Sequence, residues 1–191
     1  MKLMLAVAVG LAALALASGA SAAPPAQQDG FAGTHGEAFV VKKLTAGEAK
    51  KLGVPDALLP GKKVDAAPAA ALSPSAAGPC GACIVTCWTA TFRSGDNTTT
   101  GSYWEYENPV WCGNGSWITY ADVTRHWQYV SMWYSADGEA GPWFDGGCVG
   151  CSSIHFTIYG YFSWHPPVFP VSHTTLRLGV WMQSYGSAAY A

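Results

Sequence analysis

The chain has 191 residues and a formal net charge of −2, and half of its residues are hydrophobic. After residue 79 it contains three Arg, no Lys and seven Asp or Glu, so this part has a net charge of 3 − 7 = −4. Nucleic acid is therefore excluded as an expected partner, because neutralising phosphates requires clustered Lys and Arg.

Residues 1–22 have the pattern of a secretory signal peptide. Lys2 is followed by an apolar run to about Ala17 and by an Ala-x-Ala cleavage site at Ala20-Ser21-Ala22. The run is shorter than the roughly 20 residues that span a bilayer, and no later segment is apolar for long enough. We therefore expect a secreted, extracellular protein with no membrane span in its mature form, and disulfides rather than free thiols.

Residues 23–79 are rich in Ala, Pro, Gly and Lys, which predicts a flexible leader, linker or pro-segment. One short helix is expected from Ala46 to Leu52, because Thr45 and Glu48 have the spacing of a capping box and Gly53 follows. A pro-segment that masks or chaperones the folded domain is one interpretation of this region. We favour a spacer with local structure.

Residues 80–191 predict the folded domain, since they hold all nine Trp, all nine Tyr and five of the seven Phe. β-Branched and aromatic runs alternate with turn residues, and no helical period of useful length is present. The predicted fold class is all-β, an antiparallel β-sandwich or small barrel of about six to seven strands held by disulfides. The expected strands cover residues 84–92, 101–106, 110–112, 116–120, 126–134, 153–164 and 175–183.

Turn residues should separate these strands. Ser94–Asn97 is expected to turn the chain after the first strand. Asn114-Gly115 predicts a type I′ hairpin. Ala136–Gly138 should end the strand that begins at His126.

The two C-terminal strands show clear alternation, which predicts one face toward the core and one face away from it. In the first, the apolar set is Ile154, Phe156, Ile158, Phe162 and Trp164, and the other set is His155, Thr157, Tyr159, Tyr161 and Ser163. In the second, Leu176, Leu178, Val180 and Met182 alternate with Thr175, Arg177, Trp181 and Gln183.

The segment Trp111-Cys112-Gly113-Asn114-Gly115-Ser116-Trp117-Ile118-Thr119 resembles a W-C-x-N-G-x-x-I-T hairpin of small secreted bacterial all-β proteins of unknown function. The resemblance covers nine residues. It implies secretion and an all-β domain, and it implies no activity, so it assigns no catalytic residue.

The six cysteines, four of which form two C-x-x-C pairs, are Cys80, Cys83, Cys87, Cys112, Cys148 and Cys151. A zinc ribbon separates such pairs by about 15 to 20 residues, whereas Cys83 and Cys148 are 65 positions apart. A redox motif would be followed by a helix, but strand-forming residues follow Cys83. We expect structural disulfides, with Cys87 bonded to Cys112 and the Cys80/Cys83 pair bonded to the Cys148/Cys151 pair. Bonding within each C-x-x-C pair remains the alternative.

Two carboxylates are weak catalytic candidates. Glu105 and Glu107 are two residues apart, so both would lie on one face of a strand, within the separation that glycoside hydrolases use. However, Glu107 precedes Asn108-Pro109, where the strand is expected to end, and this favours a solvated position.

Histidines and acidic residues suggest further sites without a convincing pattern. His126, His155, His165 and His173 are expected to be separate surface or edge residues, because no G-x-S-x-G motif accompanies them. Asp137, Glu139 and Asp145 are expected in one Gly-rich loop, and their spacing fits no calcium-binding loop. We therefore expect no metal and no cofactor.

Aromatic residues on the polar faces of strands are the best indication of function. Tyr159, Tyr161 and Trp181, together with Arg177, are predicted to bind a ligand. The favoured hypothesis is a non-catalytic extracellular binding module for polysaccharide, cell envelope or another protein. The alternatives are an extracellular hydrolase that uses Glu105, Glu107 or a histidine, and a structural or inhibitory secreted protein.

Overall fold

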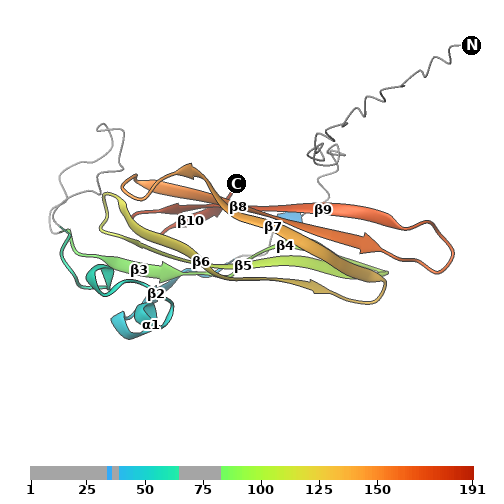
Figure 1. Ribbon diagram of the computed structural model, residues 1–191, viewed down its shortest axis with the longest axis horizontal. Helices are drawn as coiled ribbons and strands as arrows, with labels where there is room; N and C mark the ends of the chain where they lie inside the picture. Colours follow the sequence, from blue (N-terminus) through green and yellow to red (C-terminus); the bar gives the residue numbers. More distant parts are fainter. Residues whose placement is uncertain (1–33, 36–38, 65–82) are drawn as a thin grey trace, which may run out of the picture.

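The computed structural model describes residues 34–35, 39–64 and 83–191 (Figure 1). The predicted signal peptide, much of the predicted leader and Cys80 lie outside these ranges. The described strands are β1 (Thr34–His35), β2 (Lys42–Leu44), β3 (Thr86–Thr89), β4 (Phe92–Thr98), β5 (Gly101–Gly113), β6 (Ile118–Val130), β7 (Tyr134–Gly147), β8 (Ser153–Trp164), β9 (Ser172–Gln183) and β10 (Ala188–Tyr190). A short helix, α1 (Ala46–Lys51), and a 3-10 turn, η1 (Asp56–Leu58), precede β3.

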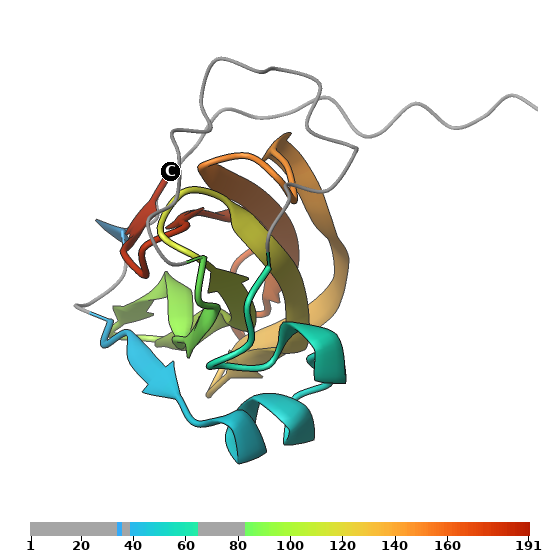
Figure 2. The ribbon, with the colours of Figure 1, turned by 90° about the vertical axis from the view of Figure 1, so that its left-hand side faces the viewer.

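The strands form two antiparallel sheets, stacked as an elongated sandwich (Figures 1 and 2). In the first sheet, β6 pairs with one edge of β5, while β4 and β3 pair with successive segments of its other edge. The second sheet has the order β10-β9-β8-β7. The predicted antiparallel sandwich is confirmed and the small barrel is wrong, because β6 and β7, although consecutive, belong to different sheets.

The alternation predicted for β8 and β9 determines which residues enter the core. The apolar sides of both strands pack with Phe92, Trp111 and Ile118 of the first sheet. A second, smaller cluster joins Tyr103, Phe162 and Leu176 farther along the same strands. Each fully buried large side chain stabilises the fold by roughly 1.5–3 kcal/mol, so these two clusters hold the sheets together.

A third cluster covers the outer side of the first sheet. The predicted helix is confirmed: Thr45 accepts from the backbone of Glu48, and Glu48 accepts from the backbone of Thr45. Its buried Ala49 packs with Leu44 and Val54 against Val110 and the cysteines of β3 and β5. Figure 2 shows this segment lying against one end of the sheet. The part of the predicted leader from Phe39 to Val64 is thus packed on the β-domain.

The disulfides differ in part from the predicted pairing. Cys87 is bonded to Cys112, as predicted, from directly opposite positions of β3 and β5 with Cα atoms 4.0 Å apart. Cys148 is bonded to Cys151, so the predicted bond to the Cys80/Cys83 pair is wrong, and the alternative of a bond within this C-x-x-C pair is confirmed. The tight turn between β7 and β8 places the Cα atoms of Cys148 and Cys151 5.0 Å apart, a separation that a disulfide can bridge. Cys83 is also disulfide-bonded.

Three turns were wrongly predicted. Ser94–Asn97 lies inside β4, and Ala136–Gly138 lies inside β7; the chain instead turns at 131–133, where Met132 has φ +54°. The hairpin between β5 and β6 is present, but it is not type I′: Gly115 has a positive φ and Asn114 does not. The Asn114 side chain instead accepts bonds from the backbone of Ser116 and Trp117. Its amide oxygen thereby stabilises a longer loop.

Replacing Cys87 and Cys112 together by Ala should lower the free energy of unfolding by about 3–4 kcal/mol, because this bond closes a 25-residue separation in the unfolded chain. The matched change at Cys148 and Cys151 should cost only about 2 kcal/mol, because its loop is short. Denaturant unfolding of both variants measures the difference. Equal costs would contradict the role given to the Cys87–Cys112 bond.

Candidate functional site

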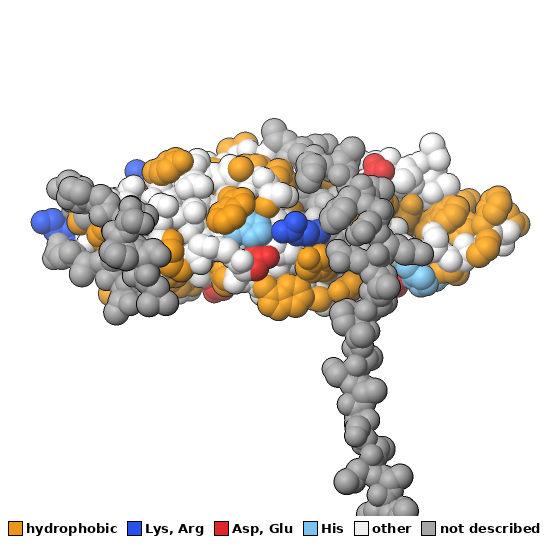
Figure 3. Space-filling view, turned by 90° about the horizontal axis from the view of Figure 1, so that it is seen from above, with side chains coloured by type: hydrophobic (Ala, Val, Ile, Leu, Met, Phe, Trp, Pro, Cys, Tyr) orange, Lys and Arg blue, Asp and Glu red, His pale blue; other side chains and the backbone are white. Residues whose placement is uncertain are grey.

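The four residues predicted to bind a ligand lie on one surface, the outer side of the β7–β10 sheet. Tyr159 is opposite Arg177 in the β8–β9 ladder, and Tyr161 and Trp181 share their face. Trp143 of β7 joins them, with its ring 5.9 Å from that of Tyr159. We call Trp143, Tyr159, Tyr161 and Trp181 the aromatic face. Seen from this side, Figure 3 shows hydrophobic side chains gathered around a histidine and a basic side chain.

The Trp181 indole packs against β8 and β7, with its plane tilted by 35° to the His155 ring. Its ring is 4.7 Å from the ring of His155, which is directly opposite it on β8. It also reaches β7, since a Cβ atom added to Gly146 would be 3.0 Å from the indole. The indole is therefore partly packed against protein, and 36% of the residue's surface is open to solvent. The absence of a side chain at Gly146 makes this orientation possible.

Polar atoms lie beneath and beside this ring. The Nδ1 atom of His155 is hydrogen-bonded to Asp145, which fixes the imidazole. The Nε2 atom points toward Gly179, where an added Cβ would be 3.2 Å away. Among the described residues this atom has no hydrogen-bond partner, and the same holds for Thr157 Oγ1 and Arg177 Nε. All three atoms are buried, so the aromatic face covers polar atoms that lack a partner among the described residues.

The two candidate carboxylates occupy a different place, inside the sandwich. Glu105 and Glu107 are fully buried, so the expected solvated position of Glu107 is wrong. The reason is that β5 continues through Asn108-Pro109 to Gly113, with a bulge opposite β6, instead of ending there. Both side chains lie between the two apolar clusters that join the sheets.

Few groups compensate this burial. Glu105 accepts a bond from Gln128, the residue opposite it on β6, and Gln128 also donates to the carbonyl of Gly138. Gly160 of β8 leaves the space that Glu105 fills, since a Cβ there would be 2.2 Å from Glu105 Oε2. Both oxygens of Glu107 have no partner among the described residues.

Burial changes the acidity of both groups. Removal from water raises the pKa of Glu105 to about 8, with a further contribution from the charge of Glu139. Burial raises the pKa of Glu107 to about 9, and Glu105 and Glu139 add to the rise. Both carboxyls are therefore neutral acids at pH 7. Glu139, bonded to His126, lies nearer the solvent at the edge between β6 and β7.

The other acidic and histidine residues do not converge on one site. The expected Gly-rich loop is wrong, because Asp137, Glu139 and Asp145 all lie in β7. Each has a different partner: Asp137 accepts from Ser135 and Ser163, Glu139 binds His126, and Asp145 binds His155. No cluster of metal-ligating side chains is present among the described residues.

Asp137 also connects two histidines through serines. His165 contacts Ser135, and His173 contacts Ser163. Hydrogen bonding to Ser163 lowers the pKa of Asp137. In a nucleophilic triad the carboxylate orients the histidine, and the histidine then activates the serine. Here the carboxylate accepts from the serines, so the arrangement does not activate them.

Sequence reasoning missed a second aromatic surface, on the outer side of the β5–β6 pair. Tyr106 and Trp127 are stacked with centroids 4.8 Å apart and planes at 7°. Arg125 lies over Trp127, and Arg93 lies over Trp104, at 4.7 and 4.5 Å from the ring centroids. The i, i+2 spacing of Trp104 with Tyr106 is the signal that could have located it. Because the arginines cover these rings, fewer ring faces are free on this surface than on the aromatic face.

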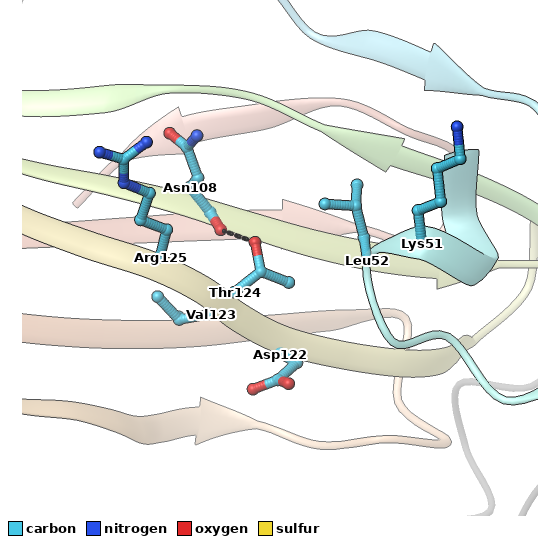
Figure 4. A pocket seen from close by; sticks show the side chains of 7 residues that line it. All are labelled: Lys51, Leu52, Asn108, Asp122, Val123, Thr124 and Arg125. Carbon is cyan, nitrogen blue, oxygen red and sulfur yellow. Dashed lines mark hydrogen bonds between the residues drawn. The ribbon is translucent and has the colours of Figure 1, made fainter.

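A shallow hollow lies where this surface meets α1 (Figure 4). One hydrogen bond crosses it, from Thr124 to the carbonyl of Asn108. It contains none of the residues predicted to bind or to react. Its lining consists of Lys51, Leu52, Asn108, Asp122, Val123, Thr124 and Arg125.

No known protein family, curated protein or solved structure matches this chain. Within the described part of the chain, no helix has the length and apolar character needed to cross a bilayer.

The free energy of unfolding should fall as the pH rises from about 5 to 9. Folding raises the pKa values of Glu105 and Glu107 above their ordinary value of 4.5. The contribution of these two groups to the free energy of unfolding is therefore complete below pH 4.5 and is lost as the pH rises through about 8 and 9. The slope should reach about 1.4 kcal/mol per pH unit for each ionising group. Thermal unfolding of Glu107→Gln should show a reduced slope, because an amide stays neutral.

Asp122→Asn is the control, since this carboxyl is exposed on the same sheet and should leave the slope unchanged. If the free energy of unfolding of the wild type stayed constant between pH 5 and 9, Glu105 and Glu107 could not be buried as neutral acids.

Proposed function

We propose that the protein is a secreted, non-catalytic binding module that binds a polysaccharide through the aromatic face. The observation that carries this proposal is the position of Trp181, which packs against His155 and Gly146 and is still 36% exposed. A pyranose ring has an apolar side made of C–H bonds, and the electron-rich face of an indole complements it. An indole held by contacts within the protein loses little conformational freedom when the sugar binds.

The polar groups around Trp181 suit sugar hydroxyls. Arg177 and the Tyr159 hydroxyl lie opposite each other on β9 and β8. His155 Nε2 and Thr157 Oγ1 are buried, so the partly exposed Arg177 and Tyr159 are the polar groups that a sugar hydroxyl would meet. Such groups, placed around an aromatic contact, fix the orientation of a ligand.

Charge favours a neutral glycan. The part of the chain after residue 79 has seven acidic residues against three Arg. Arg93 and Arg125 are placed on the opposite sheet, over Trp104 and Trp127. Arg177 is thus the single arginine of this part on the aromatic face, and an acidic polysaccharide would meet little positive charge there.

A location outside the cell agrees with two features. The predicted signal peptide supplies a route for secretion. The disulfides at Cys87–Cys112 and Cys148–Cys151 are typical of an oxidising compartment.

An extracellular hydrolase is the second candidate, and the raised pKa values of Glu105 and Glu107 favour it, because catalytic acids often have such values. Against it, both carboxyls are fully buried, whereas a general acid must reach its substrate. The binding module is therefore preferred.

Replacing Trp181 and Tyr161 together by Ala should weaken binding to neutral glycans at least tenfold. The matched control replaces Trp133 and Tyr129 by Ala. These rings are similarly exposed, at 39% and 50% against 36% and 37%, and they lie away from the aromatic face. Binding is measured by co-sedimentation with insoluble cellulose and chitin and on an array of neutral oligosaccharides.

Absence of wild-type binding to every glycan would overturn the proposal, and so would equal losses in both double variants. Hydrolysis that is lost in Glu105→Gln or Glu107→Gln would instead support the hydrolase.

A further inference from the structure

Two turns meet at one end of the sandwich. Because β7 begins where the antiparallel β8 ends, the turn at 131–133 lies beside the longer turn at 165–171. A backbone hydrogen bond of 2.7 Å from His165 to Trp133 joins them. Figure 1 shows the β8–β9 hairpin projecting beyond the first sheet, and Figure 3 shows hydrophobic side chains gathered at this end. We call Met132, Trp133, Val168, Phe169 and Val171 the apolar tip.

All five side chains of the apolar tip are exposed large hydrophobics, and Val168 retains 82% of its accessible surface. Residues 130–136 and 164–172 contain no Asp, Glu, Lys or Arg. Single exposed apolar side chains are ordinary, whereas a cluster of them on a projecting end marks an interaction surface.

Polarity changes in order along this end. The aliphatic and phenyl side chains occupy the turns themselves. Trp133, the last residue of the first turn, is less exposed than Val168 and Met132, at 39% against 82% and 72%. Ser135 and Asp137 follow it in β7 and are hydrogen-bonded to each other. Hydrocarbon, indole and hydrogen-bonding groups follow one another in the same order across the boundary of a lipid bilayer.

The backbone of the longer turn also suits an apolar medium. Pro166, Pro167 and Pro170 have no N–H group, so three of its seven residues have no backbone donor that would be left unpaired on leaving water. The N–H of His165 is already bonded to Trp133. The cost of desolvating the turn is thereby reduced.

We propose that the apolar tip inserts into the surface of a neutral phospholipid bilayer. The contact is weak and reversible, and it does not cross the bilayer. Val168, Phe169 and Met132 enter the edge of the hydrocarbon, and Trp133 lies at the level of the headgroups. The tip has no Lys or Arg, and Asp137 lies behind it, so anionic lipids gain no attraction. A few side chains without a lipid anchor produce weak binding, which millimolar lipid reveals.

The test is flotation of the purified chain with phosphatidylcholine vesicles at millimolar lipid. The wild type should float with the vesicles, and Val168→Asp combined with Phe169→Asp should reduce the bound fraction at least fivefold. The matched control combines Val40→Asp with Ile84→Asp, which adds the same two charges at exposed apolar positions of the β2–β3 region and should bind like the wild type. Thermal unfolding should be unchanged in both variants.

Three outcomes overturn this proposal: failure of the wild type to float with phosphatidylcholine, equal flotation of the tip variant, or flotation with anionic vesicles alone. Sedimentation velocity without lipid adds a fourth, because self-association lost in the tip variant would identify a second copy as the occupant. The tip variant should retain glycan binding, so the two proposals fail separately.

Discussion

The packing of β8 and β9 against β5 is the contact on which the rest of the structure depends. Side chains alternate along a strand, so each residue that enters the layer between the sheets places its neighbours outside. Ile158 and Leu178 enter the core, and Tyr159 and Arg177 are thereby held on the opposite face. The aromatic face is a consequence of the same alternation that builds the core.

This packing is interrupted at one place. Glu105 and Glu107 separate the cluster around Trp111 from the cluster around Tyr103. An ionised carboxylate would be costly there, and the protein avoids most of the cost by keeping the two groups protonated. Gly160 on the facing strand supplies the space. The middle of the sandwich is therefore polar but uncharged at neutral pH. The stability of the whole fold should consequently fall as the pH becomes alkaline.

The outer surfaces differ in how their aromatic rings are held. On the first sheet, Arg93 lies over Trp104 and Arg125 lies over Trp127, so these rings interact mainly within the protein. On the second sheet, Trp181 packs against His155 and is still 36% exposed, and this difference makes the aromatic face the better candidate for a ligand. The apolar tip is a third type of surface. The proposed glycan and lipid contacts lie on different parts of the molecule and need not compete.

The sequence by itself determined the all-β class, the two faces of β8 and β9 and the capped helix, because each follows from local spacing. Among the possible cysteine pairings it did not choose, and the structure decided for Cys87–Cys112 by placing the two residues opposite each other on β3 and β5. The sequence also indicated that Tyr159, Tyr161, Arg177 and Trp181 lie on the face of their strands that points away from the core. Only the tertiary structure decided that Glu107 is buried, that Asp137, Glu139 and Asp145 have separate partners, and that Trp181 packs against His155. These properties depend on Gly146, Gly160 and a bulge in β6, where strands distant in sequence meet, and no local pattern encodes which strands will face each other.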